Sequence, residues 1–276
     1  PSESAEPTGR SADRLVFRSD RGGGADGLYV MSDRGGDVRK LVPNDRDVLH
    51  FAVHPTGRRV AYVCEPNDTE AVELGVIGVD GGERVPVHHG IRLAPRWSRD
   101  GRRLAFMHYS SRWRIRLTDP DLAIQRPEQD HIGGDGAPSW FPGDRQLAFQ
   151  SIRTGRLELV VADARTGVAR QITDTRSAES SPHVSPSGEW IAYSSGPRLG
   201  IVRADGSGAR LLTEDREKAT DAEWAPDSKQ IAFTLDRDGN RDVYIVSVEA
   251  DGTVVRRLTH HASDDHSPTW SPDGER

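Results

Sequence analysis

The chain has 276 residues, of which 34% are hydrophobic and 29% charged, and its mean hydropathy is −0.65. Its 43 acidic and 37 basic residues give a net charge of −6, which argues against generic nucleic-acid binding, because that function usually needs a strongly basic face. No run approaches the ~18 consecutive apolar residues that suggest a membrane-spanning helix. We therefore expect neither nucleic acid nor membrane insertion.

The N-terminal residues 1–13, PSESAEPTGRSAD, contain no apolar side chain larger than alanine. Such a segment cannot bury enough apolar surface to fold, so we expect a flexible linker followed by one domain over residues 14–276. The sequence shows neither an initiator methionine nor a signal peptide, and we expect a processed or excised chain. Its single cysteine, Cys64, excludes an intramolecular disulfide and is expected to be buried.

A repeat of roughly 40–45 residues runs through the rest of the chain, a period typical of propellers and solenoids. Each unit carries a turn of the Pro-Asp-Gly type and then a short apolar run, as in WSRDGRRLAF at Trp97–Phe106. Proline presets φ for such a turn, and glycine accepts the positive φ that follows. The aromatic residues that close the units are Phe17, Tyr62, Phe106, Phe149, Tyr193 and Phe233.

Each unit predicts four short antiparallel strands, A to D, with the turn between A and B. Four such strands bury too little apolar surface alone and must stack on neighbours. We therefore predict an all-β fold, a six-bladed β-propeller of four-stranded antiparallel blades. Strand D of the irregular third unit is expected within Asp121–Arg126. The tryptophans of the A strands are expected to pack between blades; they are Trp97, Trp140, Trp224 and Trp270.

The repeat is split between the two ends of the chain. Ser267–Arg276 reads SPTWSPDGER, an opening half, and Arg14–Asp20 reads RLVFRSD, a closing half. We therefore predict that the C-terminal strand closes the ring by pairing with the N-terminal blade. In this arrangement Thr269–Ser271 is the innermost strand of a blade whose other strands are Leu15–Arg18, Leu28–Ser32 and Val38–Val42.

These motifs resemble the TolB-like propeller family with its WD40-like PD40 repeats. The family pattern, P-x-W-S-P-D-G-x-x-I-A-F followed by I-Y-V-x-D-x-x-G-G and L-T, is matched almost residue for residue by Ser267–Arg276, Glu223–Thr234 and Asp236–Thr259. The resemblance implies a bacterial, extracytoplasmic protein (periplasmic, secreted or cell-surface). Such repeats occur in TolB, in gating propellers of prolyl-oligopeptidase-like peptidases and in oligogalacturonate lyases, so they indicate the fold rather than one function. The printed sequence matches neither TolB's N-terminal α/β domain nor a G-x-S-x-G motif.

The D–A and B–C loops vary between units and should emerge on one face, where partner chemistry is expected. Histidines and acids in the D–A loops could meet at the channel mouth and bind a ligand or protein partner. They could also hold a divalent metal, because imidazole and carboxylate suit Zn, Mn or Ca. The alternative is ordinary solvated loop polarity, since the spacing matches no ligand signature. The candidates are His88, His89, His131, Asp135, Glu179, Asp221, Asp264, Asp265 and His266.

Two aromatic residues of the third unit, Tyr109 and Trp113, lie in a predicted B–C hairpin outside the repeated core positions. Exposed Tyr and Trp commonly anchor partners, so both are candidate partner anchors. Alternatively, Trp113 folds back over its own blade. The segment Asp236–Asp242 resembles the start of a calcium loop, but Ser247 occupies the position that needs a bidentate Glu, and a hairpin is predicted instead.

The leading hypothesis is a monomeric, non-enzymatic propeller module that binds a protein or small ligand at the loop face and central channel, with no assigned catalytic residue or cofactor. One alternative is a channel-sited lyase or hydrolase of the oligogalacturonate-lyase kind. Another is a gating propeller of a prolyl-oligopeptidase-like peptidase. The enzyme hypothesis requires at least three channel histidines to converge within reach of one metal; these are His88, His89, His131, His261 and His266.

Overall fold

The computed structural model describes residues 14–21, 26–32, 35–42, 46–66, 72–82, 84–89, 91–109, 113–118, 124–125, 135–214, 217–237, 239–248, 254–271 and 273–276. Within these ranges the regular secondary structure is entirely β, in 23 strands. The described part of the chain contains no helix long and apolar enough to cross a membrane. The predicted linker, residues 1–13, lies outside the described residues. The chain divides into two compact units, Pro1–Pro95 and Arg96–Arg276.

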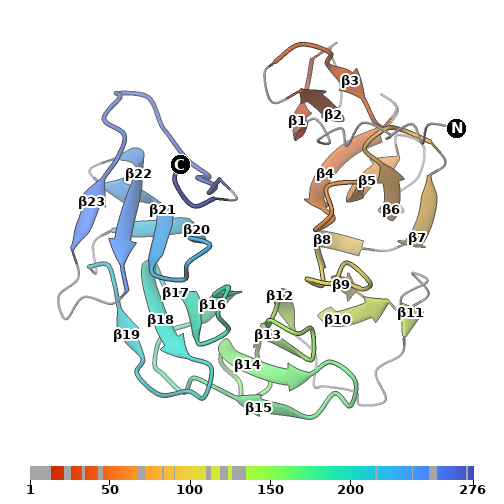
Figure 1. The fold of residues 1–276 in the computed structure, drawn as a ribbon. Helices are drawn as coiled ribbons and strands as arrows, with labels where there is room; N and C mark the ends of the chain where they lie inside the picture. The colour runs from red at the N-terminus through yellow and green to blue at the C-terminus, as the bar shows by residue number, and fades with distance from the viewer. Residues whose placement is uncertain are drawn as a thin grey trace, which may run out of the picture. The chain divides into compact units, whose positions relative to one another are not determined.

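The first unit contains two antiparallel sheets (Figure 1). One has three strands in the order β1-β2-β3: β1 (Arg14–Ser19), β2 (Gly27–Ser32) and β3 (Arg39–Lys40). The other has four in sequence order: β4 (Arg46–Val53), β5 (Arg59–Pro66), β6 (Glu73–Gly78) and β7 (Val85–His89). Buried residues of β2, β4 and β5 form one core cluster, so the apolar surface lies between the two sheets.

The third sheet starts at the division between the units and has the order β8-β9-β10-β11. Its strands are β8 (Ile91–Trp97), β9 (Leu104–Tyr109), β10 (Trp113–Thr118) and β11 (Ile124–Gln125), so the short outer strand falls where it was predicted. Three further four-stranded sheets follow in the second unit. They comprise β12 (Gly136–Trp140), β13 (Gln146–Ser151), β14 (Glu158–Asp163) and β15 (Ala169–Gln171); β16 (Glu179–Val184), β17 (Trp190–Ser195), β18 (Arg198–Arg203) and β19 (Arg210–Leu211); and β20 (Lys218–Trp224), β21 (Gln230–Arg237), β22 (Asn240–Ser247) and β23 (Val255–Arg257).

Six antiparallel sheets with neighbouring strands in sequence order confirm the all-β fold class and the six blades of a β-propeller. The first blade has three described strands rather than four, and no strand is assigned to residues 269–271. The ring-closing pairing of Thr269–Ser271 therefore stays a prediction. The segment Asp236–Asp242 forms the predicted hairpin, with Arg237 opposite Asn240.

Most of the repeated aromatic residues form the core between neighbouring blades, as predicted, whereas Phe17 and Trp270 are only partly buried. Five closing aromatics are buried: Tyr62, Phe106, Phe149, Tyr193 and Phe233. The A-strand tryptophans Trp97, Trp140 and Trp224 are buried as well, and so is Cys64. In the second unit, Trp224 and Phe233 pack in one cluster with Ile201, which belongs to the preceding blade. Within each unit, neighbouring sheets therefore share a core.

The innermost strands of the second unit share a β-bulge. Three residues before the A-strand Trp or Val, the backbone adopts a positive φ of 49–56°, at Ala137, Ser181, Asp221 and Ser267. The strand register shifts at this point in β12, β16 and β20. The amide of Ser181 donates to Gln150 Oε1 (2.9 Å) and that of Ser267 to Thr234 Oγ1 (3.0 Å). Both acceptors belong to the preceding blade, which therefore fixes the bulge.

A second contact between blades comes from the indole N–H of the A-strand tryptophans. Trp140 Nε1 donates to the Arg96 carbonyl (3.1 Å), and Trp224 Nε1 donates to the His183 carbonyl (2.8 Å). Trp270 Nε1 donates in the same way to the Glu223 carbonyl (3.1 Å). Residues 267–271 thus occupy the position of an innermost strand beside β20, near the label C in Figure 1.

The substitution Trp270→Phe tests this contact. Phenylalanine retains most of the ring but cannot donate to Glu223, so we expect a loss of about 0.5–1.5 kcal/mol in the free energy of unfolding. Trp224→Phe should show a loss of the same order, because its indole makes the equivalent bond. Denaturant unfolding measures both. An unchanged stability for Trp270→Phe beside a destabilised Trp224→Phe would show that the terminal segment is not held as an inner strand.

Tyrosine on strand B pairs with glycine on strand C in two blades. Tyr62 lies opposite Gly75 and Tyr193 opposite Gly200. A Cβ on Gly200 would lie 2.9 Å from Tyr193 Cζ, closer than real contacts allow. In the β12–β15 blade the corresponding pair is Phe149 and Val160. The space over glycine is therefore taken by the tyrosine ring and hydroxyl.

Gly200→Val should destabilise the protein by about 1–3 kcal/mol through overpacking against Tyr193. The double variant Tyr193→Phe/Gly200→Val copies the Phe149–Val160 pair and should recover part of that loss. Thermal or denaturant unfolding of the two single variants and the double variant gives the coupling between the positions. Strict additivity of the two changes would show that the ring and the glycine are not sterically linked.

Candidate functional site

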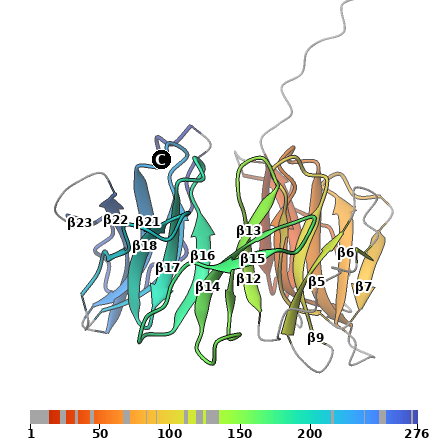
Figure 2. The same cartoon turned by 90° about the horizontal axis from the view of Figure 1, so that it is seen from below.

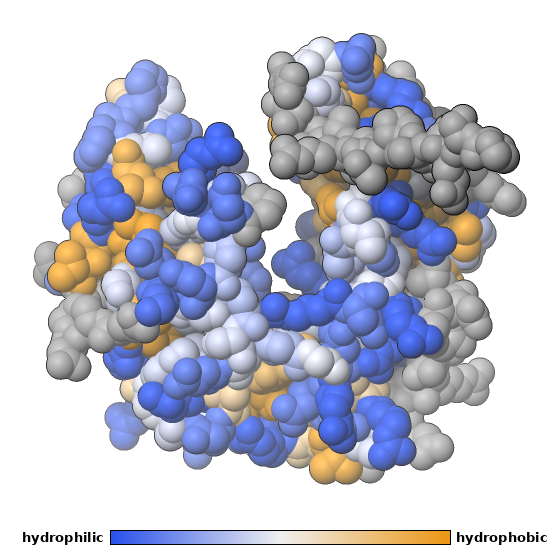
Figure 3. Space-filling model, viewed as in Figure 1, coloured by the Kyte–Doolittle hydropathy of each residue, from blue (hydrophilic) through white to orange (hydrophobic). Residues whose placement is uncertain are grey.

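The D–A and B–C loops leave the same ends of the strands in each blade of the second unit, because successive strands are antiparallel. Figure 2 shows the strands running side by side, with the connections at their two ends. We call the end with the D–A and B–C loops of the second unit the loop face. Figure 3 shows hydrophilic side chains over much of the viewed surface, with apolar spots in the region of β22 and β23.

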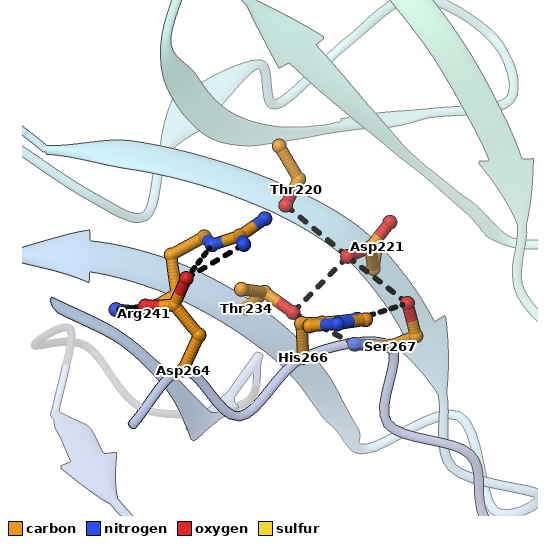
Figure 4. A network of polar contacts seen from close by, with 7 residues as sticks. All are labelled: Thr220, Asp221, Thr234, Arg241, Asp264, His266 and Ser267. Atoms are coloured by element: carbon orange, nitrogen blue, oxygen red, sulfur yellow. Dashed lines mark hydrogen bonds and ion pairs between the residues drawn. The ribbon is translucent and has the colours of Figure 1, made fainter. Parts of the chain in front are cut away.

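Asp221 lies at the centre of a hydroxyl cluster on the loop face (Figure 4). Its Oδ2 accepts hydrogen bonds from Thr220 Oγ1 (3.2 Å), Thr234 Oγ1 (3.1 Å) and Ser267 Oγ (3.4 Å). His266 Nδ1 lies 3.1 Å from Ser267 Oγ. Two of the predicted residues, Asp221 and His266, are therefore brought together, through a serine that had not been singled out.

Asp264 forms a charged pair with Arg241 beside this cluster (Figure 4). The guanidinium donates to Asp264 Oδ2 from Nε (2.9 Å) and Nη2 (2.6 Å), and the Arg241 amide donates to Oδ1 (3.1 Å). These hydrogen bonds lower the pKa of Asp264 below its usual value. The amide of Asp265 donates to the Arg241 carbonyl (2.7 Å). The terminal loop is thereby tied to the β21–β22 hairpin.

Asp135 and Glu179 are buried, with only 2% and 1% of their surfaces exposed. Arg153 lies beside Asp135, with Nη2 3.9 Å from Oδ1. Glu179 Oε1 instead accepts hydrogen bonds from Thr175 Oγ1 (2.6 Å) and Ser195 Oγ (3.0 Å). Glu179 is thereby bonded to the loop that carries Thr175, whereas Asp221 and Asp264 reach the surface.

The histidine cluster stays a prediction. His131 lies outside the described residues, and His88 and His89 lie in β7 but their side chains are not described. His261 Nδ1 accepts the Ser263 amide (3.1 Å), a local contact within its loop. Among the described residues, no three His, Cys, Asp or Glu side chains are placed to hold a metal ion.

Two polar residues of the innermost strands, His183 and Glu223, were not identified from the sequence. His183 Nδ1 donates to the Ala222 carbonyl (2.8 Å) and lies 3.6 Å from Glu223 Oε2. In the neutral ring this leaves the lone pair on Nε2. A signal was available, because each directly precedes an A-strand Val or Trp. The residue at this position is different in every unit, whereas the residues around it follow the repeated pattern.

Tyr109 and Trp113 face each other across the β9–β10 hairpin. Their ring centroids are 5.1 Å apart with a tilt of 58°, a favourable geometry for an aromatic pair. Tyr109 is 53% exposed, and Trp113 is partly buried. Ile152, which occupies the corresponding hairpin position of the next blade, is 49% exposed. The loop face thus presents apolar side chains on two neighbouring blades.

Comparison with known sequences places these repeats among bacterial propellers. Curated relatives include a protein named TolB homolog from Chlorobaculum tepidum, 32% identical over 117 residues (41% of this chain, 26% of the relative). The Tol-Pal system protein TolB of Anaeromyxobacter dehalogenans is 36% identical over 135 residues (47% and 30%). The uncharacterized peptidase YuxL of Bacillus subtilis is 33% identical over 144 residues (50% and 20%). The chain therefore spans a third or less of the length of these relatives.

Solved structures share the fold at low sequence identity. TolB from Acinetobacter baumannii matches with a TM-score of 0.66 at 19% identity, over 88% of this chain and 64% of that one. An oligogalacturonate lyase in complex with manganese matches with a TM-score of 0.64 at 14% identity (90% and 74%). Puromycin hydrolase gives 0.69 at 15% identity (91% and 46%). A TolB protein, a lyase and a hydrolase thus share this architecture, and the likeness shows the fold alone.

The family profile described as the TolB beta propeller domain, PD40, matches residues 56–220, more than half of the chain. This range begins in the A–B turn before β5 and ends within β20, so it covers β5 to β7 of the first unit and then the strands from β8 to β19. The repeated turns, aromatic core positions and blade topology described above agree with this match. The chain belongs to the TolB β-propeller family.

Proposed function

We propose that this chain is a non-enzymatic binding module that engages a protein partner through the loop face, acting as a monomer outside the cytoplasm. The observation that carries the proposal is the Tyr109–Trp113 pair on the β9–β10 hairpin, in which Tyr109 is 53% exposed. Aromatic side chains of this kind dominate the energetics of many protein interfaces. The relatives named for the Tol-Pal system support a protein as partner and an extracytoplasmic location.

The composition of the loop face also supports a protein partner. Ile152 extends the apolar area beyond the aromatic pair, and Asp221 and Asp264 supply polar groups at the last blade. His183 and Glu223 add hydrogen-bonding groups on the inner strands. Apolar and polar side chains exposed on one face are typical of a partner site.

A second candidate is a propeller that accompanies a peptidase domain. The similarity to YuxL favours it, although the chain covers only 20% of that relative. Sequencing the complete gene tests it, because a peptidase domain adjoining the propeller would support this candidate.

The proposed interface can be tested with Tyr109→Ala/Trp113→Ala and a matched control, Val168→Ala. Val168 is 62% exposed, but it follows a C–D turn at the opposite end of the strands. Partners captured from an extracytoplasmic extract are identified, and their dissociation constants are measured for the wild type and both variants. We expect the double variant to bind at least tenfold more weakly, about 1.4 kcal/mol, with a nearly unchanged melting temperature.

The control should bind like the wild type. Unchanged affinity in the double variant, or an equal loss in Val168→Ala, would contradict the proposed interface. A melting temperature lowered by several degrees in the double variant would assign Trp113 to the fold instead. Failure to capture any partner with the intact protein would contradict the binding function itself.

A further inference from the structure

A pair of buried carboxylates lies beneath the loop that joins β15 to β16, residues 172–178. Glu158, at the start of β14, and Glu179, at the start of β16, are each only 1% exposed. Both oxygens of Glu158 accept hydrogen bonds from this loop, from Thr173 Oγ1 (2.7 Å) and the Thr175 amide (3.1 Å). Thr175 Oγ1 donates in turn to Glu179 Oε1 (2.6 Å). The loop is therefore held by both acids at once.

Glu179 differs from its counterpart in the preceding blade. Asp135 occupies the same repeat position and has Arg153 beside it. In the Glu179 blade the position equivalent to Arg153 is Pro197, which carries no charge. The Glu179 Oε2 atom is buried and, among the described residues, has no hydrogen-bond partner. Ionising a carboxyl group in this position costs free energy, because its burial removes water and no hydrogen bond to Oε2 replaces that water.

We propose that Glu158 and Glu179 form a proton-dependent latch that holds residues 172–178 against the loop face and releases them as the pH rises. With one proton on Glu179 Oε2, the pair carries a single negative charge and Oε1 can still accept from Thr175 and Ser195. When that proton is lost, two buried carboxylates share the site. Opening the loop exposes both carboxylates to water, which stabilises their charges.

The groups around Glu179 favour its protonated form in the closed loop, as the proposed latch requires. Burial raises the pKa of Glu179 above its usual value of 4.5, and the neighbouring Glu158 adds to this effect. The hydrogen bonds from Thr175 and Ser195, together with the charge of Arg198 on β18, act in the opposite direction. Burial raises the pKa of Tyr193, on β17, to about 12, so its phenol stays neutral while Glu179 titrates.

The sign of the effect follows from proton linkage. The closed loop binds the Glu179 proton more tightly than the open loop, in which the carboxyl is hydrated. The closed state is therefore favoured most below the ordinary carboxyl pKa, and it loses this advantage as the pH rises through the raised pKa. The latch itself does not depend on any partner. Its consequence, a loop face that changes with pH, rests on the proposed binding function.

Hydrogen–deuterium exchange of peptides covering residues 172–179 tests the latch from pH 4.5 to pH 8, with each rate corrected for intrinsic exchange. In the wild-type protein we expect protection of this loop to fall by about tenfold or more as the pH rises, because the closed state loses its proton-linked advantage. Glu179→Gln should keep the loop protected across the range, because the neutral amide cannot ionise. The control Asp135→Asn should retain the wild-type pH dependence.

A second variant tests the latch independently if Glu179→Gln fails to fold. Glu158→Gln removes the neighbouring charge, so the loop should lose less protection with pH than in the wild type. Equal protection of the wild-type loop at all pH values would overturn the latch. So would the same loss of protection in the wild type and in Glu179→Gln. Neither result involves a partner, so failure of the latch is distinguishable from failure of the binding function.

Discussion

The interface between neighbouring sheets is the constraint on which the structure depends. A sheet of four short strands has two apolar faces, and it cannot bury either of them alone. The buried aromatics satisfy this requirement by packing between sheets, as Trp224 and Phe233 do with Ile201. Hydrogen bonds between the sheets then fix their relative positions. The indole of Trp224 donates to the preceding inner strand, and the amide of Ser181 donates to Gln150.

This constraint explains which parts of the structure the sequence predicts. Turns such as Ser98–Gly101 and closing aromatics such as Phe106 repeat because each blade needs them, so strands and core could be read from the pattern. The bulge could not be predicted in this way, because the residue with the positive φ is not the same in each blade. It is alanine, serine or aspartate. Sequence also cannot show that Glu179 is buried while Asp221 is exposed, since their partners come from distant segments.

Residues outside the interfaces are free to differ, and the candidate functions are found among them. The hairpin tip that carries Tyr109 in one blade carries Ile152 in the next. Likewise, the buried acid of one blade, Asp135, has Arg153 beside it, whereas in the next blade Pro197 stands at the position equivalent to Arg153. The same scaffold can thus accommodate the proposed binding area and the proposed pH-sensitive loop without altering the contacts that hold the blades together. Differences between equivalent positions therefore indicate function more directly than the repeated motifs do.

Native-state hydrogen exchange of the bulge amides tests most directly the central claim that each inner strand is held by the preceding blade. Ser181 lies within an assigned strand, whereas Ser267 lies in a segment with no assigned strand. Both amides donate to a side chain of the preceding blade. The account predicts that Ser267 is protected to a degree comparable with Ser181. Exchange of the Ser267 amide at the rate of an unstructured chain end, beside a protected Ser181, would contradict it.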